Sequence, residues 1–185
     1  MAANCGIAAG ISIDCAALRV IGGLDARVWA FNIDDLQASS YTVDVNGYVT
    51  AISFETYKGL YTLEGRKKSH SAGSQLVVAG EGGNKFFQHD VTIKLFPDTP
   101  DDDDVIENLA VGNFGFIVED SNQNFFLYGQ TNGCEATEGV QNSGTTPESD
   151  VATAMTFTGE EKQRPLRVLT TDYATTLAYL ESLEV

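Results

Sequence analysis

The chain has 185 residues, of which 43% are apolar, and 11 basic residues stand against 26 acidic ones. This length and apolar content suit a single globular domain with a sizeable core. The net charge of −15 at pH 7 argues against a protein that grips nucleic-acid phosphates, because an acidic surface repels a polyanion.

No apolar run is long enough to span a membrane, and the first twenty residues lack the basic segment that opens a secretory signal. The sequence therefore predicts a soluble protein that is made in a cytoplasm and does not insert into a membrane. Cys5, Cys15 and Cys134 are an odd number of cysteines without metal-binding spacing. Free thiols are expected, with a Cys5 to Cys15 bridge as the alternative.

Turn-forming residues recur at short intervals, and the segments between them are rich in β-branched and aromatic residues. This pattern predicts a mostly antiparallel β protein that begins with a strand over 26–33. Asn46-Gly47 predicts a two-residue type I′ hairpin loop within 42–54, with Val45 opposite Tyr48. One face of that hairpin would then carry Val43, Val45, Tyr48, Ile52 and Phe54, and the other Asp44, Val49 and Ser53.

The segment 86–96 alternates between apolar and polar residues, which predicts a strand with one buried face. The expected core face holds Phe87, His89, Val91, Ile93 and Leu95, and the opposite face Gln88, Asp90, Thr92 and Lys94. His89 is accordingly interpreted as a core or interface histidine. Before this strand, residues 66–73 form a basic, small-residue segment that we expect to be a long exposed loop.

Two helices are expected among the strands. Thr99 is a suitable N-cap and Pro100 a suitable first residue for a helix over 99–110, with the four aspartates 101–104 complementing the helix dipole. Its apolar stripe would consist of Val105, Ile106 and Leu109. A second hairpin is expected over 114–129 and a strand over 151–159. Near the C-terminus, Tyr173, Leu177 and Leu180 have helical spacing.

No motif for catalysis or metal binding is present in the sequence. The aspartate run 101–104 lacks the alternating ligands and central glycine of a calcium loop, and the two histidines and three cysteines lack zinc-site spacing. No nucleophile motif is found, and the glycine pairs lack the strand-to-helix context of phosphate loops. The sequence predicts neither an enzyme nor a cofactor.

Three segments of the C-terminal half resemble a known family. "LYGQTNG" (127–133), "SGTTPESD" (143–150) and "AMTFTGEEKQRP" (154–165) occur in an order and spacing similar to those of tail tube proteins of tailed bacteriophages. The resemblance covers residues 125–168 and is weaker in the N-terminal half. Cys134 departs from the family pattern, which carries an aliphatic residue there.

The resemblance implies a β-sandwich or split barrel of two antiparallel sheets with one flanking helix. It divides the chain into an N-terminal arm (1–25), a β domain (26–168) and a C-terminal strand and helix extension (169–185). Copies of the chain would form hexameric rings, and the rings would stack into the tail tube. An acidic lumen has no attractive wells for phosphate, so DNA could slide through it during ejection.

A basic loop on an acidic body also suits a head-to-tail interface, in which unlike surfaces meet. The predicted subunit interface consists of Arg66, Lys67, Lys68, Glu160, Glu161, Lys162 and Arg164. The predicted lumen-facing acids are Asp44 and Asp90. The partners would be other copies of the chain, the tape measure, terminator and baseplate proteins of the tail, and transiently DNA. The location would be the virion tail, after assembly in the bacterial host cytoplasm.

Two other classes of function stay open on the sequence. One is a virion protein of related fold that stops at a single ring, such as a tail terminator, completion protein or baseplate hub. The other is a carbohydrate-binding or adhesive β-sandwich, for which aromatic clusters in loops would be expected. An enzyme comes last because no convergent polar site is evident.

Overall fold

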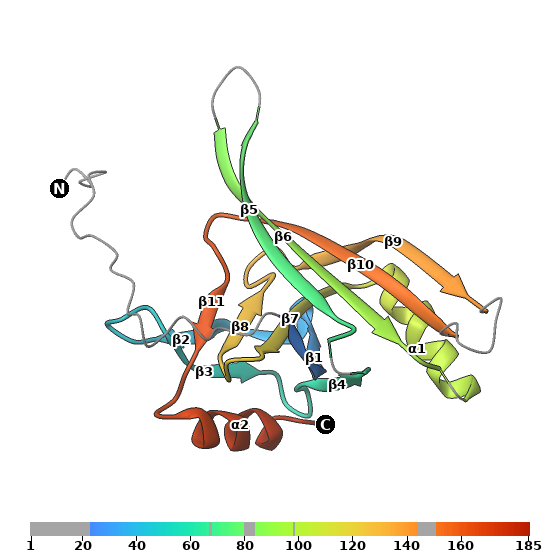
Figure 1. Ribbon diagram of the computed structural model, residues 1–185. Coiled ribbons are helices and arrows are strands. Elements are labelled where there is room, and N and C mark those ends of the chain that lie inside the picture. Colours follow the sequence, from blue (N-terminus) through green and yellow to red (C-terminus); the bar gives the residue numbers. More distant parts are fainter. Residues whose placement is uncertain (1–22, 67, 80–83, 98, 144–150) are drawn as a thin grey trace.

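The computed structural model describes residues 23–66, 68–79, 84–97, 99–143 and 151–185. The fold is mainly β with two α-helices in this part of the chain (Figure 1), which confirms the predicted fold class. Residues 1–22 of the predicted arm lie outside the described residues, and so do Lys67, Cys5 and Cys15.

The elements follow one another along the chain with short connections. The N-terminal half contains β1 (Leu24–Asn32), a 3-10 turn η2 (Ile33–Asp35), β2 (Leu36–Val43), β3 (Val49–Phe54), β4 (Tyr61–Glu64), β5 (Ser71–Ala79) and β6 (Asn84–Leu95). The C-terminal half contains α1 (Pro100–Val111), β7 (Asn113–Asp120), β8 (Phe125–Tyr128), β9 (Cys134–Asn142), β10 (Ala152–Glu161), β11 (Leu166–Val168) and α2 (Tyr173–Ser182).

All described strands belong to one hydrogen-bonded sheet that folds into two layers. Its path runs β2-β3-β11-β8-β7-β9-β10-β6-β5, and β1 pairs with both β7 and β4. The named strands pair in antiparallel fashion except β11 and β3. The long strands β5, β6, β10 and β9 form one layer, and the shorter strands around β1 and β7 form the other (Figure 1). The two predicted sheets are thus two layers of one continuous sheet.

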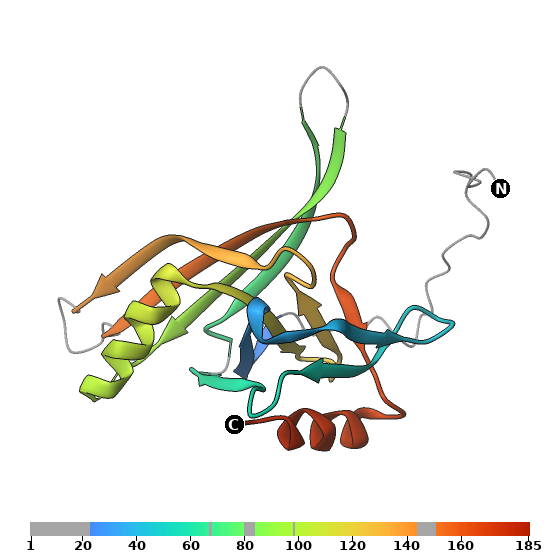
Figure 2. The same cartoon turned by 180° about the vertical axis from the view of Figure 1, so that it is seen from behind.

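Alternate residues of β1 face two separate cores. Val28 and Ala30 pack in a core with β6, β10 and Leu109 of α1, which we call the long-strand core. Trp29 and Phe31 pack in a second core with β3, β8 and Leu180 of α2, which we call the C-terminal core. The two helices accordingly cover different parts of the molecule (Figure 2). β1 therefore lies in a layer that is buried on both faces.

β6 has the predicted alternation. His89, Val91, Ile93 and Leu95 are buried, and Phe87 is partly buried. The residues between them are only partly buried, because one face of β6 packs on the long-strand core and the other does not. The prediction for this strand is confirmed.

The capping prediction for α1 is confirmed as well. Thr99 accepts a hydrogen bond from the amide of Asp102, and the Asp102 side chain accepts one from the amide of Thr99, which completes a capping box. The predicted apolar stripe is only partly correct, because Leu109 is buried but Val105 is 45% exposed. At the C-terminal helix, Asp172 accepts from the amide of Thr175 as N-cap.

The hairpin around Asn46 has a three-residue loop instead of the predicted two-residue loop. The Gly47 amide donates to the Asp44 carbonyl at 3.1 Å, and the Asp44 amide donates to the Tyr48 carbonyl at 2.9 Å. Gly47 has a φ of +85°, while Asn46 is not in the left-handed region. A type I′ turn needs both residues there, so the predicted turn type was wrong.

The predicted faces of the hairpin hold for Ile52 and Phe54, which pack on the C-terminal core, but they are wrong close to the loop. Val45 is fully exposed and Val43 is 47% exposed, whereas Val49 is buried. The pairing of β2 with β3 shifts by one residue between Thr42 and Val43, and such a shift moves the side chains beyond it to the other face. The cause is the carboxylate of Asp44, which accepts from two backbone amides of the loop at 2.8 and 2.9 Å and so closes the longer loop.

The predicted exposed loop over 66–73 is a short turn in the structure. β5 begins directly after His70, which is buried. The Ser69 hydroxyl donates to the Arg66 carbonyl at 2.6 Å and accepts from the Arg66 amide at 3.1 Å. The Lys68 amide donates to a carbonyl of β1 at 3.2 Å. The predicted exposure holds for Arg66 and Lys68, but the predicted length was wrong, because residues 71–73 belong to β5 and His70 fills the interior.

Candidate functional site

The four long strands present one face to the long-strand core and an opposite face that is mostly polar, with Ala154 and Val140 among its apolar residues. We call this second face the polar face. It carries Gln88, Asp90, Thr92 and Lys94 of β6, Thr156, Thr158 and Glu160 of β10, and Glu138 of β9. Asp90, predicted to face a lumen, lies on this surface opposite Thr158.

Hydrogen bonds cross the polar face from strand to strand. Thr158 Oγ1 donates to Asp90 Oδ1 at 3.0 Å, and Gln88 Nε2 donates to the same oxygen at 3.0 Å. The hydroxyls of Thr92 and Thr156 lie 3.1 Å apart across the same pair of strands. These bonds hold short side chains against the sheet, so the polar face is a hydrogen-bonded surface.

The sheet that carries the polar face has open edges. β5 pairs with β6 alone among the described strands, and its sequence "SAGSQLVVA" holds no charge and no proline. Such an edge pairs readily with another strand, because its outer amides and carbonyls lack strand partners. On the other side, β9 meets β7 only at Glu135 and Cys134. The rest of its outer edge is also without a partner strand in the described part of the chain.

The outer half of the β5–β6 hairpin projects from the body of the molecule (Figure 1). Leu76 is 55% exposed and Val78 is 59% exposed on this projection. Leu76 lies opposite Phe87 in the register. The hairpin therefore presents apolar side chains away from both cores.

Glu161 was predicted to lie at a subunit interface, and this prediction is wrong. Its side chain is 2% exposed, and Oε1 accepts from the amides of Thr131 and Asn132 at 2.7 and 2.8 Å. Two amide donors offset the cost of burying a carboxylate. Glu161 thus holds the turn between β8 and β9 within one chain. Its neighbour Glu160 is exposed on the polar face opposite Gln88.

Lys162 and Arg164 are exposed and line a groove of about 1010 Å³. Four segments form this groove: the loop 46–48, the base of the β5–β6 hairpin, strand β8 and the segment 162–167. Arg167 also lines it, with its guanidinium 5.5 Å from the ring centre of Phe126. We call it the basic groove. Sequence reasoning missed Arg167, although its alternation with Leu166 after Pro165 was a signal of an outward residue.

The basic residues that were predicted to form one subunit interface lie in two separate places on the molecule. The Arg66 guanidinium lies 4.4 Å from the ring centre of Phe96, just beyond the end of β6. The basic groove lies near the other end of β6, at Phe87. Lys68 is exposed next to Arg66 in the turn before β5. The structure thus separates Arg66 and Lys68 from the groove.

Asp44, the other residue predicted to face a lumen, closes its own hairpin loop. Hydrogen bonds from backbone amides, that of Tyr48 above all, lower the pKa of its carboxyl. Asp120 closes a second loop of the same construction, accepting from the amides of Asn122 and Asn124 at 2.8 and 2.9 Å. Asp44 is therefore a loop-forming residue that lies beside the basic groove, since residues 46–48 line it.

Both histidines are buried, and each ring has both nitrogens in hydrogen bonds. Nε2 of His70 lies 3.0 Å from the carbonyl of Ala26, and its Nδ1 accepts from the amide of Lys94. Nε2 of His89 lies 3.0 Å from the carbonyl of Gln163, and its Nδ1 accepts from a backbone amide at 3.2 Å. Desolvation lowers the pKa of both rings. These contacts suit neutral imidazoles that join strands.

The remaining candidates for chemistry are buried or scattered. Cys134 is a free, buried thiol whose pKa burial raises to about 12. Within the described ranges, no three histidine, cysteine, aspartate or glutamate side chains are grouped so that they could hold a metal ion. Neither of the described helices has the length and apolar character needed to cross a membrane.

Comparisons of the chain with family models, with curated proteins and with solved structures gave no match.

Proposed function

We propose that this chain is a structural subunit that assembles with copies of itself into rings, and that hexameric rings stack into a bacteriophage tail tube. The tube would serve as a conduit for DNA ejection. Its partners would be further copies and the tape measure, terminator and baseplate proteins of the tail. The subunit would act in the virion and not as an enzyme.

The four-stranded sheet with its polar face and open edges is the observation that carries this proposal. If the edges of neighbouring copies pair, the sheets join into a closed barrel, and closure removes the unprotected edges. The apolar face of each strand would stay on its own core, and the polar face would line the barrel. The uncharged edge of β5 is the surface that gains most from such pairing.

The charge of the polar face suits a passage for DNA. Asp90, Glu138 and Glu160 outnumber the one basic side chain, Lys94, among the residues that define it. A wall with excess negative charge offers phosphate no strong binding site. The threonine hydroxyl groups of this face already form hydrogen bonds across the strands, so they add little affinity for DNA.

Negative-stain electron microscopy of the purified chain tests the proposal. Long hollow tubes are the expected result. Isolated rings would favour the terminator or completion proteins over the tube. A chain that remains monomeric at high concentration in sedimentation would refute self-assembly altogether.

A charged substitution on the β5 edge makes the test specific. A Cβ atom added at Gly73 would meet no other atom within 4 Å, so Gly73→Lys should leave the monomer folded. Lysine protects edge strands from pairing, and assembly should therefore be lost. Thr56→Lys, in the exposed turn after β3, is the control and should still assemble. Tubes of Gly73→Lys with normal yield would remove β5 from the interface.

A further inference from the structure

The basic groove differs in charge from the rest of this acidic chain. Three of the 11 basic residues of the sequence, Lys162, Arg164 and Arg167, line it. None of its lining residues is an aspartate or glutamate, although the chain has 26 of them. Within the described residues, neither Lys162 nor Arg164 lies in a salt bridge. The groove therefore concentrates positive charge. Asp44 lies beside it, but its carboxylate is bonded to the backbone of its own loop.

The first turn of α1 has the complementary property. Asp101, Asp103 and Asp104 are exposed, and in the described part of the chain no basic side chain forms a salt bridge with them. The capping box between Thr99 and Asp102 fixes the backbone of this turn, so its three exposed aspartates have a defined place on the surface before any contact forms.

Other clustered carboxylates are already used within the chain. Asp35 pairs with Lys58 at 3.2 Å. Glu181 and Glu184 lie 3.1 and 3.9 Å from the guanidinium of Arg27. The aspartate turn is thus the densest acidic run that is exposed and has no salt bridge in the described part of the chain.

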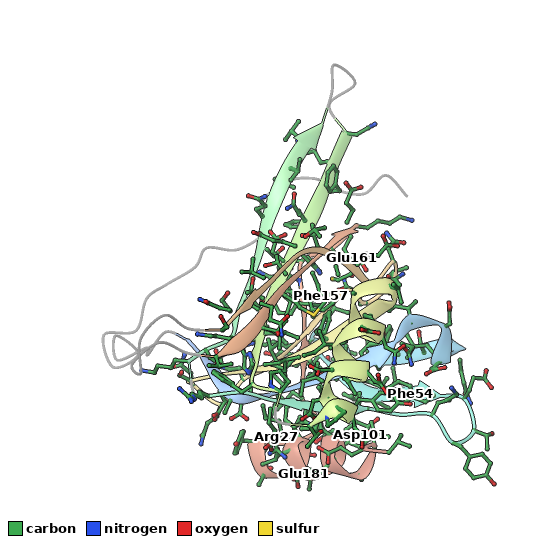
Figure 3. All side chains as sticks on the ribbon, turned by 90° about the vertical axis from the view of Figure 1, so that its right-hand side faces the viewer. Arg27, Phe54, Asp101, Phe157, Glu161 and Glu181 are labelled. Atoms are coloured by element: carbon green, nitrogen blue, oxygen red, sulfur yellow. The ribbon has the colours of Figure 1, made fainter. Side chains whose placement is uncertain are left out.

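The two surfaces lie at different ends of the molecule. The basic groove is lined in part by β11, and β11 and α1 are on opposite sides in Figure 1. Glu161 directly precedes Lys162 in the chain, and in Figure 3 it is likewise apart from Asp101. A groove and a counter-charged turn that cannot meet within one copy can meet between copies, and such a heterologous contact repeats head to tail.

We propose that the basic groove receives the first turn of α1 from a second copy of this chain. Lys162 and Arg164 would pair with Asp101, Asp103 and Asp104 of the neighbour, while Arg167, resting on Phe126, would lie at the floor. This contact rests on the proposed self-assembly and names one of its interfaces. It is separate from the pairing of sheet edges.

Charge reversal tests the contact in the full chain. Lys162→Glu with Arg164→Glu, the groove variant, should raise the protein concentration needed for self-association by about tenfold or more, because close charge pairs become repulsive. Asp101→Lys with Asp103→Lys and Asp104→Lys, the helix variant, should do the same. All these positions are exposed, so circular dichroism and thermal unfolding should show a folded monomer in both cases.

Recombining the two reversals provides the decisive measurement. An equimolar mixture of the groove variant and the helix variant, or both reversals in one chain, should restore self-association in sedimentation velocity. Lys85→Glu with Thr56→Glu and Thr171→Glu makes the same total change of charge at exposed positions outside the groove and should associate like the wild type. Raising sodium chloride from about 0.05 M to 0.5 M should weaken the wild-type contact.

The outcomes separate this contact from the proposed tube. Tubes that form normally from the groove variant would keep the tube and overturn the contact. Head-to-tail oligomers that depend on the groove but never form tubes would keep the contact and overturn the tube, and a strictly monomeric wild type would overturn both.

A groove variant that is impaired but not rescued by the helix variant would overturn α1 as the partner. Groove-dependent binding of a labelled oligothymidylate without groove-dependent self-association would assign the groove to nucleic acid instead.

Discussion

The central layer around β1 and the four-stranded sheet are held in different ways. β1 is buried on both faces and contributes alternate residues to two apolar cores. The four-stranded sheet has one apolar face and one polar face, and it has edges without partner strands in the described part of the chain. One region is complete within a single chain, whereas the other has surfaces for further contacts.

Apolar packing and buried polar side chains together connect these two regions. The long-strand core holds residues of β1 and β7 against residues of β6 and β10, and buried polar side chains add hydrogen bonds. His70 links β1 to the end of β6, and His89 links β6 to the segment after β10. Glu161 links β10 to the turn after β8. The central layer is therefore secured by packing on both of its faces. The four-stranded sheet packs on one face only, and a few buried polar side chains tie it further to the central layer.

The largest expected effect comes from breaking the central layer. Trp29 is fully buried and packs edge-on against Phe125 with ring centres 5.9 Å apart. Trp29→Ala should lower the free energy of unfolding by about 3–5 kcal/mol, because it leaves a large cavity. Urea denaturation followed by circular dichroism measures this. Val45→Ala, at a fully exposed position, should change stability by less than about 0.5 kcal/mol; similar losses for both variants would contradict the comparison.

A smaller loss of stability is expected when one of the buried polar side chains between the two regions is removed. Glu161→Ala leaves the amides of Thr131 and Asn132 without their acceptor and should cost about 2–3 kcal/mol. Glu160→Ala removes the same side chain from the exposed position next to it and should cost less than about 0.5 kcal/mol. Paired urea titrations give the difference. Equal stability of the two variants would mean that the buried carboxylate does not hold the turn.

The smallest expected effect is a dependence of stability on pH. Burial lowers the pKa of His70 and His89 below the unfolded value of 6.5. The unfolded chain therefore binds more protons, and stability that is present above pH 6.5 should decline as the pH falls below it. The raised pKa of buried Glu119 acts in the opposite direction, so a Glu119→Gln background isolates the histidines. Urea midpoints between about pH 8 and pH 5.5 measure the decline, and imidazole rings that titrate at 6.5 in the folded protein would exclude it.

Local signals with one dominant cause were predicted well from the sequence. The alternation in β6 follows from a strand that packs on a core with one face, and the Thr99 cap follows from the need to satisfy free amides at the start of α1. The Asn46-Gly47 loop failed because two signals compete there. The Asp44 carboxylate closes a longer loop than the Asn-Gly pair alone would form, and the loop at Asp120 has the same form without a glycine in that place.

The candidate site was only half predictable for a similar reason. Asp90, Lys162 and Arg164 are where polarity and charge suggested, on the surface. Glu161 is not, because charge alone does not reveal that two amides of a distant turn converge on it. The basic groove depends on segments far apart in the chain, from the loop 46–48 to the segment 162–167. Only the folded chain brings them together.

The position of Trp29 has a consequence for spectroscopy. It is the only tryptophan of the chain, and its Nε1 donates to Glu184 near the C-terminus at 2.7 Å. Its emission thus reports on the docking of the C-terminal residues and is remote from both the polar face and the edge of β5. Intrinsic fluorescence can accordingly follow folding while light scattering follows polymerisation, so one sample without any label distinguishes the two processes.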